Sequence, residues 1–303
     1  MSRSTSASPD LERRSRPLWQ GLALSAALTL LCALVNAAYG LVVERQIVLS
    51  EGPVLYAAGF DGFEDEWQTY EGRLAARIED GALRIEVGQV DTVAYSVAEP
   101  SFGDAQVEVT ARAVAGPLDN GFGLVFRLQA PRQGCAMPAP LLCELARVDA
   151  FGVLLRLIFR PQSQQASGYY VFLISSDGYY SVWRADGLGQ APRRMSTWID
   201  SPLIRQGLGE SNRLRVVMDG ERFRFAINGQ DVPLCLPDDP QGQSTYSGGQ
   251  CIGGTLQPEL RDARWPVGQV GLAAYSTVSG GPGVVVVFDD LLVLPLLREG
   301  APA

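Results

Sequence analysis

Three Asp-Gly dipeptides, each placed between two short apolar runs, constrain the fold of this chain most strongly. They are Asp80-Gly81, Asp177-Gly178 and Asp219-Gly220. Asp-Gly between such runs is a strong signal for a β-hairpin, because both residues tolerate the left-handed backbone of a tight turn. Further short apolar runs, broken by Gly, Asp, Asn and Pro, continue to about residue 295. The sequence therefore predicts an all-β fold, with two antiparallel sheets packed as a sandwich or jelly roll.

Two of the hairpins divide cleanly into one apolar and one charged face. A two-residue loop at Asp80-Gly81 pairs Ile78 with Leu83, and the same loop at Asp219-Gly220 pairs Val216 with Phe223. The opposite face of the latter hairpin carries Arg213, Arg215, Arg222 and Arg224. Such alternation predicts strands with one face in the core and one face in water.

The hairpin from Gly168 to Asp186 is different, because apolar residues lie on both of its faces. The two-residue register pairs Phe172 with Trp183 and places the following aromatic residues on one face: Tyr170, Phe172, Tyr179 and Trp183. A three-residue Ser-Asp-Gly loop would reassign the second strand, and this alternative stays open. We expect the aromatic set to line a ligand groove, since sugar rings stack on exposed aromatic side chains. Burial in the core or under a loop is the other interpretation.

The N-terminal segment predicts the compartment. Arg13, Arg14 and Arg16 precede an uncharged apolar run, Leu18–Val43, which is long enough to span a bilayer. The basic flank predicts a cytoplasmic tail and an extracytoplasmic remainder. A signal peptide cleaved before Ala38 is the alternative. The expected organisation is a tail at 1–17, an anchor or signal sequence at 18–43, a stalk at 44–53, the sandwich at 54–295 and a second tail at 296–303.

Four cysteines lie outside the predicted anchor. An even number in an exported chain favours disulfides. Three connectivities are possible, and local pairing within two Gly- and Pro-rich loops is the simplest. We therefore expect Cys135–Cys143 and Cys235–Cys251. Their spacings are not those of a zinc site.

The composition excludes several classes of function. The chain contains no His, so Ser-His-Asp and Cys-His catalysis and His-ligated metal sites are excluded. The net charge of −8 argues against a nucleic-acid partner, because phosphate binding needs a basic face. The Glu-x-Asp-x-x-Glu pattern of laminarinase-type glycosidases is absent.

A series of segments resembles the concanavalin A-like lectin/glucanase superfamily, especially laminin G-like domains and bacterial relatives of the keto-disaccharide hydrolase type. In chain order the segments are FDGFEDEW, DNGFGLVFRL, YYVFLISSDGYYSVWR, SNRLRVVMDGERFRFAINGQ, QVGLAAYS and VVVVFDDLLV. The resemblance covers residues 54–295. It implies a sandwich that binds glycans, cleaves glycans or binds proteins.

The same resemblance implies a structural calcium ion where the terminal strands meet. Asp61, Asp289 and Asp290 would supply its oxygen ligands, although no loop has a recognisable calcium spacing and ordinary turn carboxylates are the alternative. The expected function is a membrane-tethered, extracytoplasmic, non-catalytic carbohydrate-binding module, with a cell-envelope glycan as partner. A glycoside-processing hydrolase that uses Asp and Glu, or a protein-binding adhesion or sensor ectodomain, are the alternatives.

Overall fold

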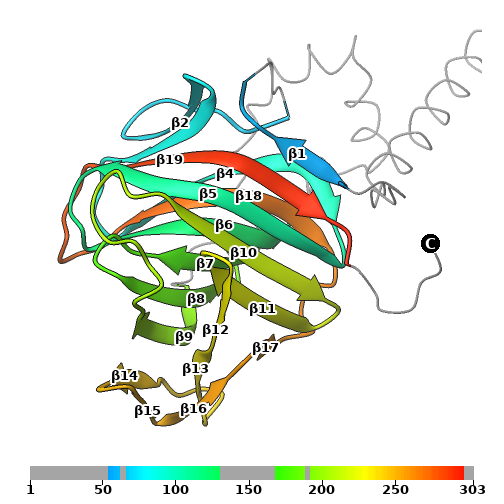
Figure 1. The fold of residues 1–303 in the computed structure, drawn as a ribbon, viewed down its shortest axis with the longest axis vertical. Helices are drawn as coiled ribbons and strands as arrows, with labels where there is room; N and C mark the ends of the chain where they lie inside the picture. The colour runs from blue at the N-terminus through cyan, green and yellow to red at the C-terminus, as the bar shows by residue number, and fades with distance from the viewer. Residues whose placement is uncertain (1–53, 62–65, 130–167, 188–191, 297–303) are drawn as a thin grey trace, which may run out of the picture. The chain divides into compact units, whose positions relative to one another are not determined.

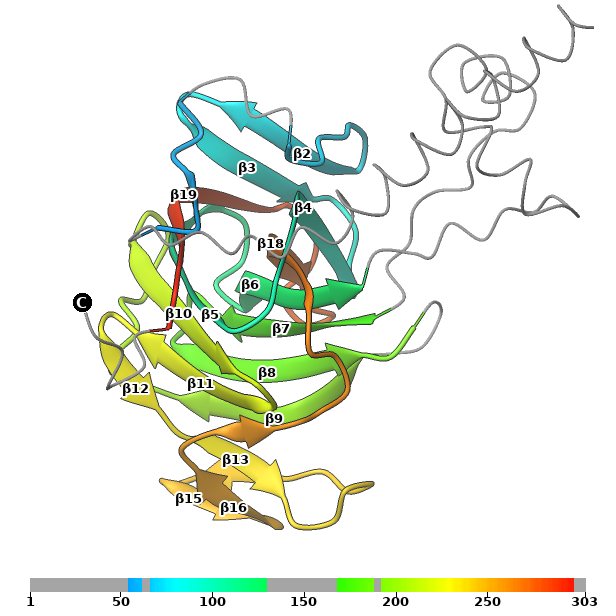
Figure 2. The same ribbon diagram turned by 90° about the vertical axis from the view of Figure 1, so that its right-hand side faces the viewer.

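The computed structural model describes residues 54–61, 66–129, 168–187 and 192–296. Its regular elements are β-strands, and two antiparallel sheets pack face to face (Figures 1 and 2). The prediction of an all-β antiparallel sandwich is therefore confirmed. Within these ranges, no helix is long and apolar enough to cross a membrane. The predicted anchor, Leu18–Val43, lies outside the described residues.

One layer is a six-stranded sheet in the order β4-β18-β6-β7-β8-β9. Its strands are β4 (Thr92–Phe102), β6 (Asn120–Gln129), β7 (Gly168–Ile174), β8 (Tyr179–Ala185), β9 (Arg193–Asp200) and β18 (Gly268–Ser276).

The other layer is a nine-stranded sheet in the order β12-β11-β10-β5-β19-β3-β2, with β1 paired to β19 and β17 paired to β11. Its strands are β1 (Tyr56–Ala58), β2 (Leu74–Glu79), β3 (Ala82–Val87), β5 (Ala105–Ala115), β10 (Asn212–Asp219), β11 (Arg222–Ile227), β12 (Gln230–Val232), β17 (Leu260–Arg261) and β19 (Val284–Leu294). Two small ribbons complete the described part: β13 (Leu234–Pro237) with β16 (Gly254–Gln257), and β14 (Thr245–Ser247) with β15 (Gln250–Ile252).

The core lies between the two sheets and follows the alternation of the strands. On β10, for example, Leu214, Val216 and Met218 are fully buried, while Arg213 and Arg215 alternate with them on the outer face. Each large apolar side chain removed from water in this way contributes about 1.5–3 kcal/mol. The two sheets are thus held together mainly by the inward-facing apolar side chains of their strands.

The structure confirms one predicted hairpin register and corrects another. Ile78 pairs with Leu83, as expected for a loop at Asp80-Gly81. In the third hairpin Val216 pairs with Phe225 rather than Phe223, so the prediction was wrong by two residues. The turn is Gly220-Glu221, whose glycine amide donates to Asp104 at 2.8 Å. Because side chains alternate with a period of two, this shift leaves the two faces unchanged.

The middle hairpin has the three-residue loop that the sequence left open. Phe172 pairs with Val182, not with Trp183, and the loop is Ser176-Asp177-Gly178. Asn120 fixes this loop, because its side chain accepts from the Ser176 amide and donates to the Ser176 hydroxyl, each at 3.0 Å. The predicted two-residue register was therefore wrong, and every residue of β8 lies on the opposite face from the one expected.

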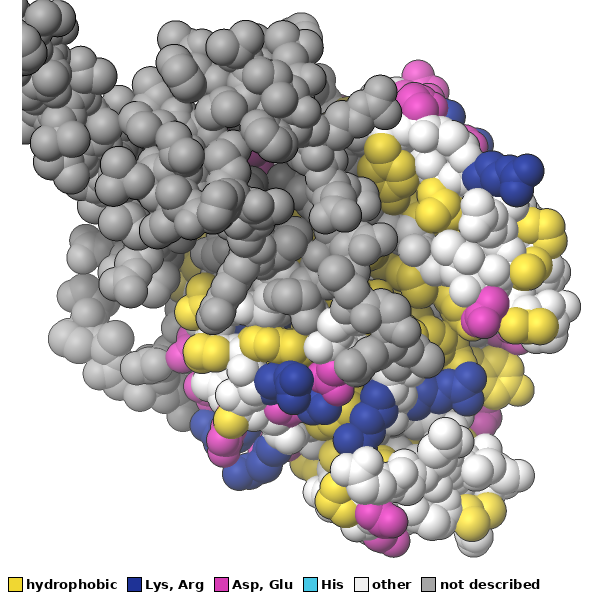
Figure 3. Space-filling model, turned by 180° about the vertical axis from the view of Figure 1, so that it is seen from behind, with side chains coloured by type: hydrophobic (Ala, Val, Ile, Leu, Met, Phe, Trp, Pro, Cys, Tyr) yellow, Lys and Arg dark blue, Asp and Glu magenta, His cyan; other side chains and the backbone are white. Residues whose placement is uncertain are grey.

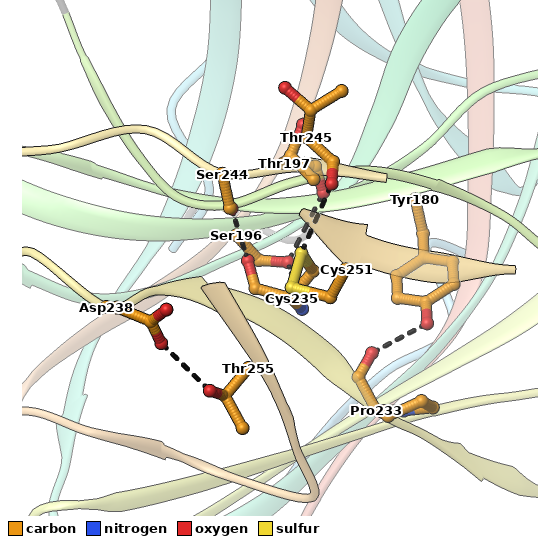
Figure 4. The surroundings of a disulfide bond; sticks show 10 residues. All are labelled: Tyr180, Ser196, Thr197, Pro233, Cys235, Asp238, Ser244, Thr245, Cys251 and Thr255. Atoms are coloured by element: carbon orange, nitrogen blue, oxygen red, sulfur yellow. Dashed lines mark hydrogen bonds between the residues drawn. A yellow bond between two sulfur atoms is a disulfide. The ribbon is translucent and has the colours of Figure 1, made fainter. Parts of the chain in front are cut away.

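The disulfide Cys235–Cys251 is present, so this prediction is confirmed (Figure 4). It joins β13 to β15. Around it, the Cys235 amide donates to Ser196 Oγ of β9 at 3.1 Å, and the Tyr180 hydroxyl donates to the Pro233 carbonyl at 2.6 Å. These bonds fasten the ribbons to the edge of the six-stranded sheet. Cys135 and Cys143 lie outside the described residues.

Candidate functional site on the outer face of the six-stranded sheet

The four predicted ligand-binding residues do not share a surface. Tyr170 and Phe172 are fully buried in the core between the sheets, where the Tyr170 ring centroid lies 5.3 Å from that of Phe126. Trp183 lies on the other face of the sheet, and Tyr179 is 41% exposed at the beginning of β8. The prediction of one aromatic face from these residues was wrong, because the three-residue loop moves β8 by one position relative to β7.

The hairpin nevertheless has a second apolar face, formed by different residues. Tyr169, Val171 and Leu173 of β7 point away from the core and join Trp183 and Ala185 of β8 in a second buried cluster. All members of this cluster come from the six-stranded sheet. We call its aromatic part the aromatic face, and it consists of Tyr95, Tyr169, Trp183, Trp198 and Tyr275.

Trp183 is the centre of the aromatic face. Its ring centroid lies 5.0 Å from that of Tyr275 and 5.8 Å from that of Trp198, and both contacts are edge-to-face. Trp183 and Tyr275 lie on β8 and β18, which β6 and β7 separate in the sheet. Gly121 of β6 makes the approach possible, since a Cβ atom there would lie only 3.2 Å from the side chain of Tyr275. The rings therefore converge above a glycine.

Polar groups border this aromatic cluster. The Trp183 indole donates to Ser181 Oγ at 2.7 Å, and the Tyr275 hydroxyl donates to Asp91 at 3.0 Å. The Arg194 guanidinium lies 5.7 Å from the centroid of the Trp183 ring, in cation–π geometry. Arg194 and Asp91 are exposed, and Trp198 is partly exposed. Hydrophobic and arginine side chains accordingly lie next to one another on the side of the molecule seen in Figure 3.

The hydroxyls of Tyr169 and Tyr275 stay protonated at neutral pH. Burial, followed by the hydrogen bond to Asp91, raises the pKa of Tyr275 to about 12. Burial also raises the pKa of Tyr169, with a smaller contribution from the neighbouring Tyr95. Both hydroxyls are thus neutral groups that can donate a hydrogen bond.

The sequence offers Arg193-Arg194 near Trp198 as a clamp for an anionic sugar, with a solvated loop as the alternative. Sequence reasoning missed Tyr95, Tyr275 and Asp91 as members of the site. Asp91 directly precedes β4 and Tyr95 lies near its beginning, whereas Tyr275 lies on β18, far away in the chain. Each sits in an ordinary alternating segment, so no local pattern marks it. Only the order of strands in the sheet, together with the registers, brings them together.

A pair of carboxylates at the other end of β8 bears on the hydrolase alternative. Asp186 lies 2.7 Å from Nε of Arg184, and Asp262 pairs with Nη1 of the same guanidinium. Glycoside hydrolysis needs one carboxyl group as an acid and a second as a base or nucleophile. Here both carboxylates face one arginine, which neutralises part of their charge and holds them in place.

The predicted calcium ligands lie where the terminal strands meet. β1 pairs with β19, with Ala58 opposite Leu291, as the calcium prediction required. Asp289 Oδ1 accepts from the amide of Asp290 at 2.7 Å, and Asp61 lies against the turn at Gly81. In the described part of the chain, no group of three or more His, Cys, Asp and Glu side chains is placed to hold a metal ion. The calcium site therefore stays a prediction.

Comparisons with known proteins do not assign the chain to a family. No family model matches the sequence, and no curated protein is significantly similar to it. Similar solved structures include a carbohydrate-binding module, CBM66, from Bacillus subtilis, with 13% identity, a TM-score of 0.43 and coverage of 76% of this chain and 95% of the other.

A second is a Bacillus subtilis protein with a galectin-like fold, with 14% identity, a TM-score of 0.49 and coverage of 82% and 99%. A third is the β-glucanase of Bacillus licheniformis, with 6% identity, a TM-score of 0.43 and coverage of 82% and 100%. Similarity at this level carries no argument about function, so the site must supply it.

Proposed function

We propose that this chain is a membrane-tethered, extracytoplasmic carbohydrate-binding module of the concanavalin A-like type, which binds a cell-envelope glycan without cleaving it. One observation carries the proposal. The aromatic face packs Trp198 and Tyr275 against Trp183 on the outer side of a sheet, bordered by the exposed charges of Arg194 and Asp91.

This arrangement matches the chemistry of a sugar. A sugar ring offers apolar C–H groups that pack on aromatic rings, and hydroxyl groups that donate to carboxylates and accept from guanidinium groups. Ligand sites commonly combine an apolar aromatic lining with a few placed polar groups. In this chain Trp198 would supply the accessible ring, Trp183 would support it, and Arg194 and Asp91 would bind hydroxyls at the border.

The proposed membrane tether and extracytoplasmic location are inferred from the sequence. The uncharged run Leu18–Val43 follows three arginines, which favours a single span with the sandwich on the far side of the membrane. The disulfide Cys235–Cys251 supports an oxidising compartment, where such bonds persist.

Absence of catalysis is part of the proposal, and the ion pairs of Arg184 support it. Both Asp186 and Asp262 are bound to that side chain, so neither is free for the two roles of glycoside hydrolysis. A hydrolase remains the alternative, and release of reducing sugar from the bound glycan would favour it.

A glycan array probed with the purified full-length chain tests the proposal. We expect selective retention on a subset of carbohydrates, and loss of that retention in Trp198→Ala. Leu256→Ala is the matched control, because Leu256 is an exposed apolar side chain on β16, which is not part of the six-stranded sheet. A correctly folded protein that binds no carbohydrate, or binds equally well without Trp198, would contradict the proposal.

A further inference from the structure

Five loops meet at one end of the sandwich. They connect β3 to β4, β5 to β6, β7 to β8, β9 to β10 and β18 to β19, at residues 88–91, 116–119, 175–178, 201–211 and 277–283 respectively. The pairings bring their neighbouring strand ends together, since Ser276 of β18 lies opposite both Asn120 of β6 and Thr92 of β4. We call this the loop end.

Hydrogen bonds join these loops into one platform. The Gly283 amide donates to the Val87 carbonyl at 2.9 Å, and the Thr277 hydroxyl donates to the Asp119 carbonyl at 3.0 Å. Asn120 holds Ser176 in the next loop, and the Ser176 carbonyl accepts from the amide of Gly207 at 2.9 Å. The loop end is therefore a pre-organised surface, which loses little conformational entropy when a partner binds.

Apolar side chains protrude from this platform. Of the eight large hydrophobic side chains that are exposed in the described part, five belong to the loop end, and their exposed fractions run from 41% to 70%. The five are Val90, Leu118, Tyr179, Leu208 and Val278. Single exposed apolar residues need no explanation, but four of these five lie in the bonded loops and Tyr179 begins β8, so all five share one end of the sandwich.

Carboxylates surround the apolar side chains. The five loops and the adjoining end of β9 carry Asp91, Asp119, Asp177, Asp200 and Glu210. None of these five forms an ion pair with another described residue. Arg205 is the basic residue within the loops, and three more arginines lie beside them: Arg73, whose carbonyl accepts from the Gly88 amide, Arg112 near the end of β5, and Arg213 of β10, which is paired with Glu108. The loop end thus has a local excess of negative charge.

We propose that the loop end docks a protein segment that presents apolar side chains flanked by Lys or Arg. Charge complementarity selects this partner. The five carboxylates attract a cationic segment, steer its approach and disfavour partners of the same sign. The exposed apolar side chains supply the area whose burial stabilises the complex.

Two other candidate partners match the charge of the loop end less well. A second copy of the chain, docked through the same end, would bring acidic loops against acidic loops, which costs free energy. An anionic lipid surface would be repelled for the same reason.

The test uses the full-length chain and two short synthetic peptides, one with Leu alternating with Lys and one with Leu alternating with Glu. Fluorescence anisotropy measures binding. We expect the Lys peptide to bind, with an affinity that falls at high salt, and the Glu peptide not to bind. Leu118→Ser with Val278→Ser should weaken binding about tenfold or more, as should Asp200→Asn with Glu210→Gln.

Val54→Ser is the matched control, since Val54 is 40% exposed beside β1 and should leave the affinity unchanged. Carbodiimide cross-linking identifies the carboxylates that the bound Lys peptide contacts, independently of the affinity measurement. The proposal requires the peptide to couple mainly to the five carboxylates of the loop end.

Two results would overturn the proposal: equal coupling over the whole surface, or equal effects of Val54→Ser and the loop-end variants on the affinity. Binding to phosphatidylcholine vesicles in preference to the peptide would also overturn it. Thermal melting confirms that each variant is folded before its affinity is compared.

Discussion

The two outer faces of the sandwich differ in chemistry although both belong to sheets of the same domain. The outer face of the nine-stranded sheet is charged and paired: Arg213 binds Glu108, Arg215 lies 2.7 Å from Asp231, and Arg222 lies 2.7 Å from Asp219. The outer face of the six-stranded sheet is apolar, with Val171 and Leu173 almost completely buried. The first is an ordinary solvent-facing sheet surface. The second has the composition of a core or a binding surface, and the proposed function depends on this difference.

The largest expected effect is on the centre of the aromatic face. Trp183 is 5% exposed and contacts two aromatic rings. Trp183→Ala should therefore destabilise the protein by about 3–5 kcal/mol, as expected for a buried aromatic side chain. Urea unfolding followed by circular dichroism measures this free energy. If the loss stayed below that of a typical surface substitution, the apolar face would be no more tightly packed than the charged one.

The second effect concerns the glycine beneath the rings. Gly121→Val adds atoms where even a Cβ would lie 3.2 Å from Tyr275. We expect a loss of about 1–3 kcal/mol from overpacking, together with a changed tryptophan emission as Trp183 and Tyr275 separate. Gly103→Val is the control, because the φ of Gly103 lies outside the left-handed region and its Cβ would meet only the Val267 side chain, at 3.9 Å. Equal losses in both variants would show that convergence of the rings is unimportant.

The third effect is a dependence on alkaline pH. The pKa of Tyr275 is raised to about 12 in the folded protein from an ordinary value of 10.0. The unfolded state therefore loses its proton first, so stability is complete below about pH 10 and falls as the pH rises toward about 12. Tyr275→Phe should make the free energy of unfolding less sensitive to pH in this window. An unchanged sensitivity would contradict the buried, Asp91-bound position of Tyr275.

The smallest effect belongs to the charged face. Arg222→Ala removes an ion pair with Asp219 whose two side chains are 49% and 37% exposed. Such pairs contribute about 0–1 kcal/mol, and salt screens them. Urea unfolding at low and high salt should show a small loss at low salt that disappears at high salt. A loss comparable with that of Trp183→Ala would remove the contrast between the faces.

The middle hairpin shows how far the sequence could predict this site. Its apolar residues on both faces correctly indicated a second apolar surface. The residues assigned to that surface were wrong, because Asn120, far away in the chain, holds Ser176 within the loop and makes it three residues long. The Asp80-Gly81 hairpin has no such contact, and its register follows from the local turn residues alone. Local patterns thus predict strands and turns, whereas a one-residue register depends on contacts between distant segments.

The loop end could not be predicted for a related reason. Val90, Leu118 and Val278 are single apolar residues in polar turns, and nothing in the sequence distinguishes them from residues that fold back into the core. The strand pairings bring their loops to one end, and only then do the exposed side chains form a surface.

The most direct test of the central claim is tryptophan fluorescence during titration with the carbohydrate that the array selects. If the glycan binds at the aromatic face, the emission of the wild-type chain changes with saturation. The double variant Trp183→Phe, Trp198→Phe should then show no change, even though Trp67 and Trp265 remain elsewhere in the described structure. Saturable binding that leaves the wild-type emission unaltered, or that changes it equally in the double variant, would place the glycan elsewhere and contradict the account.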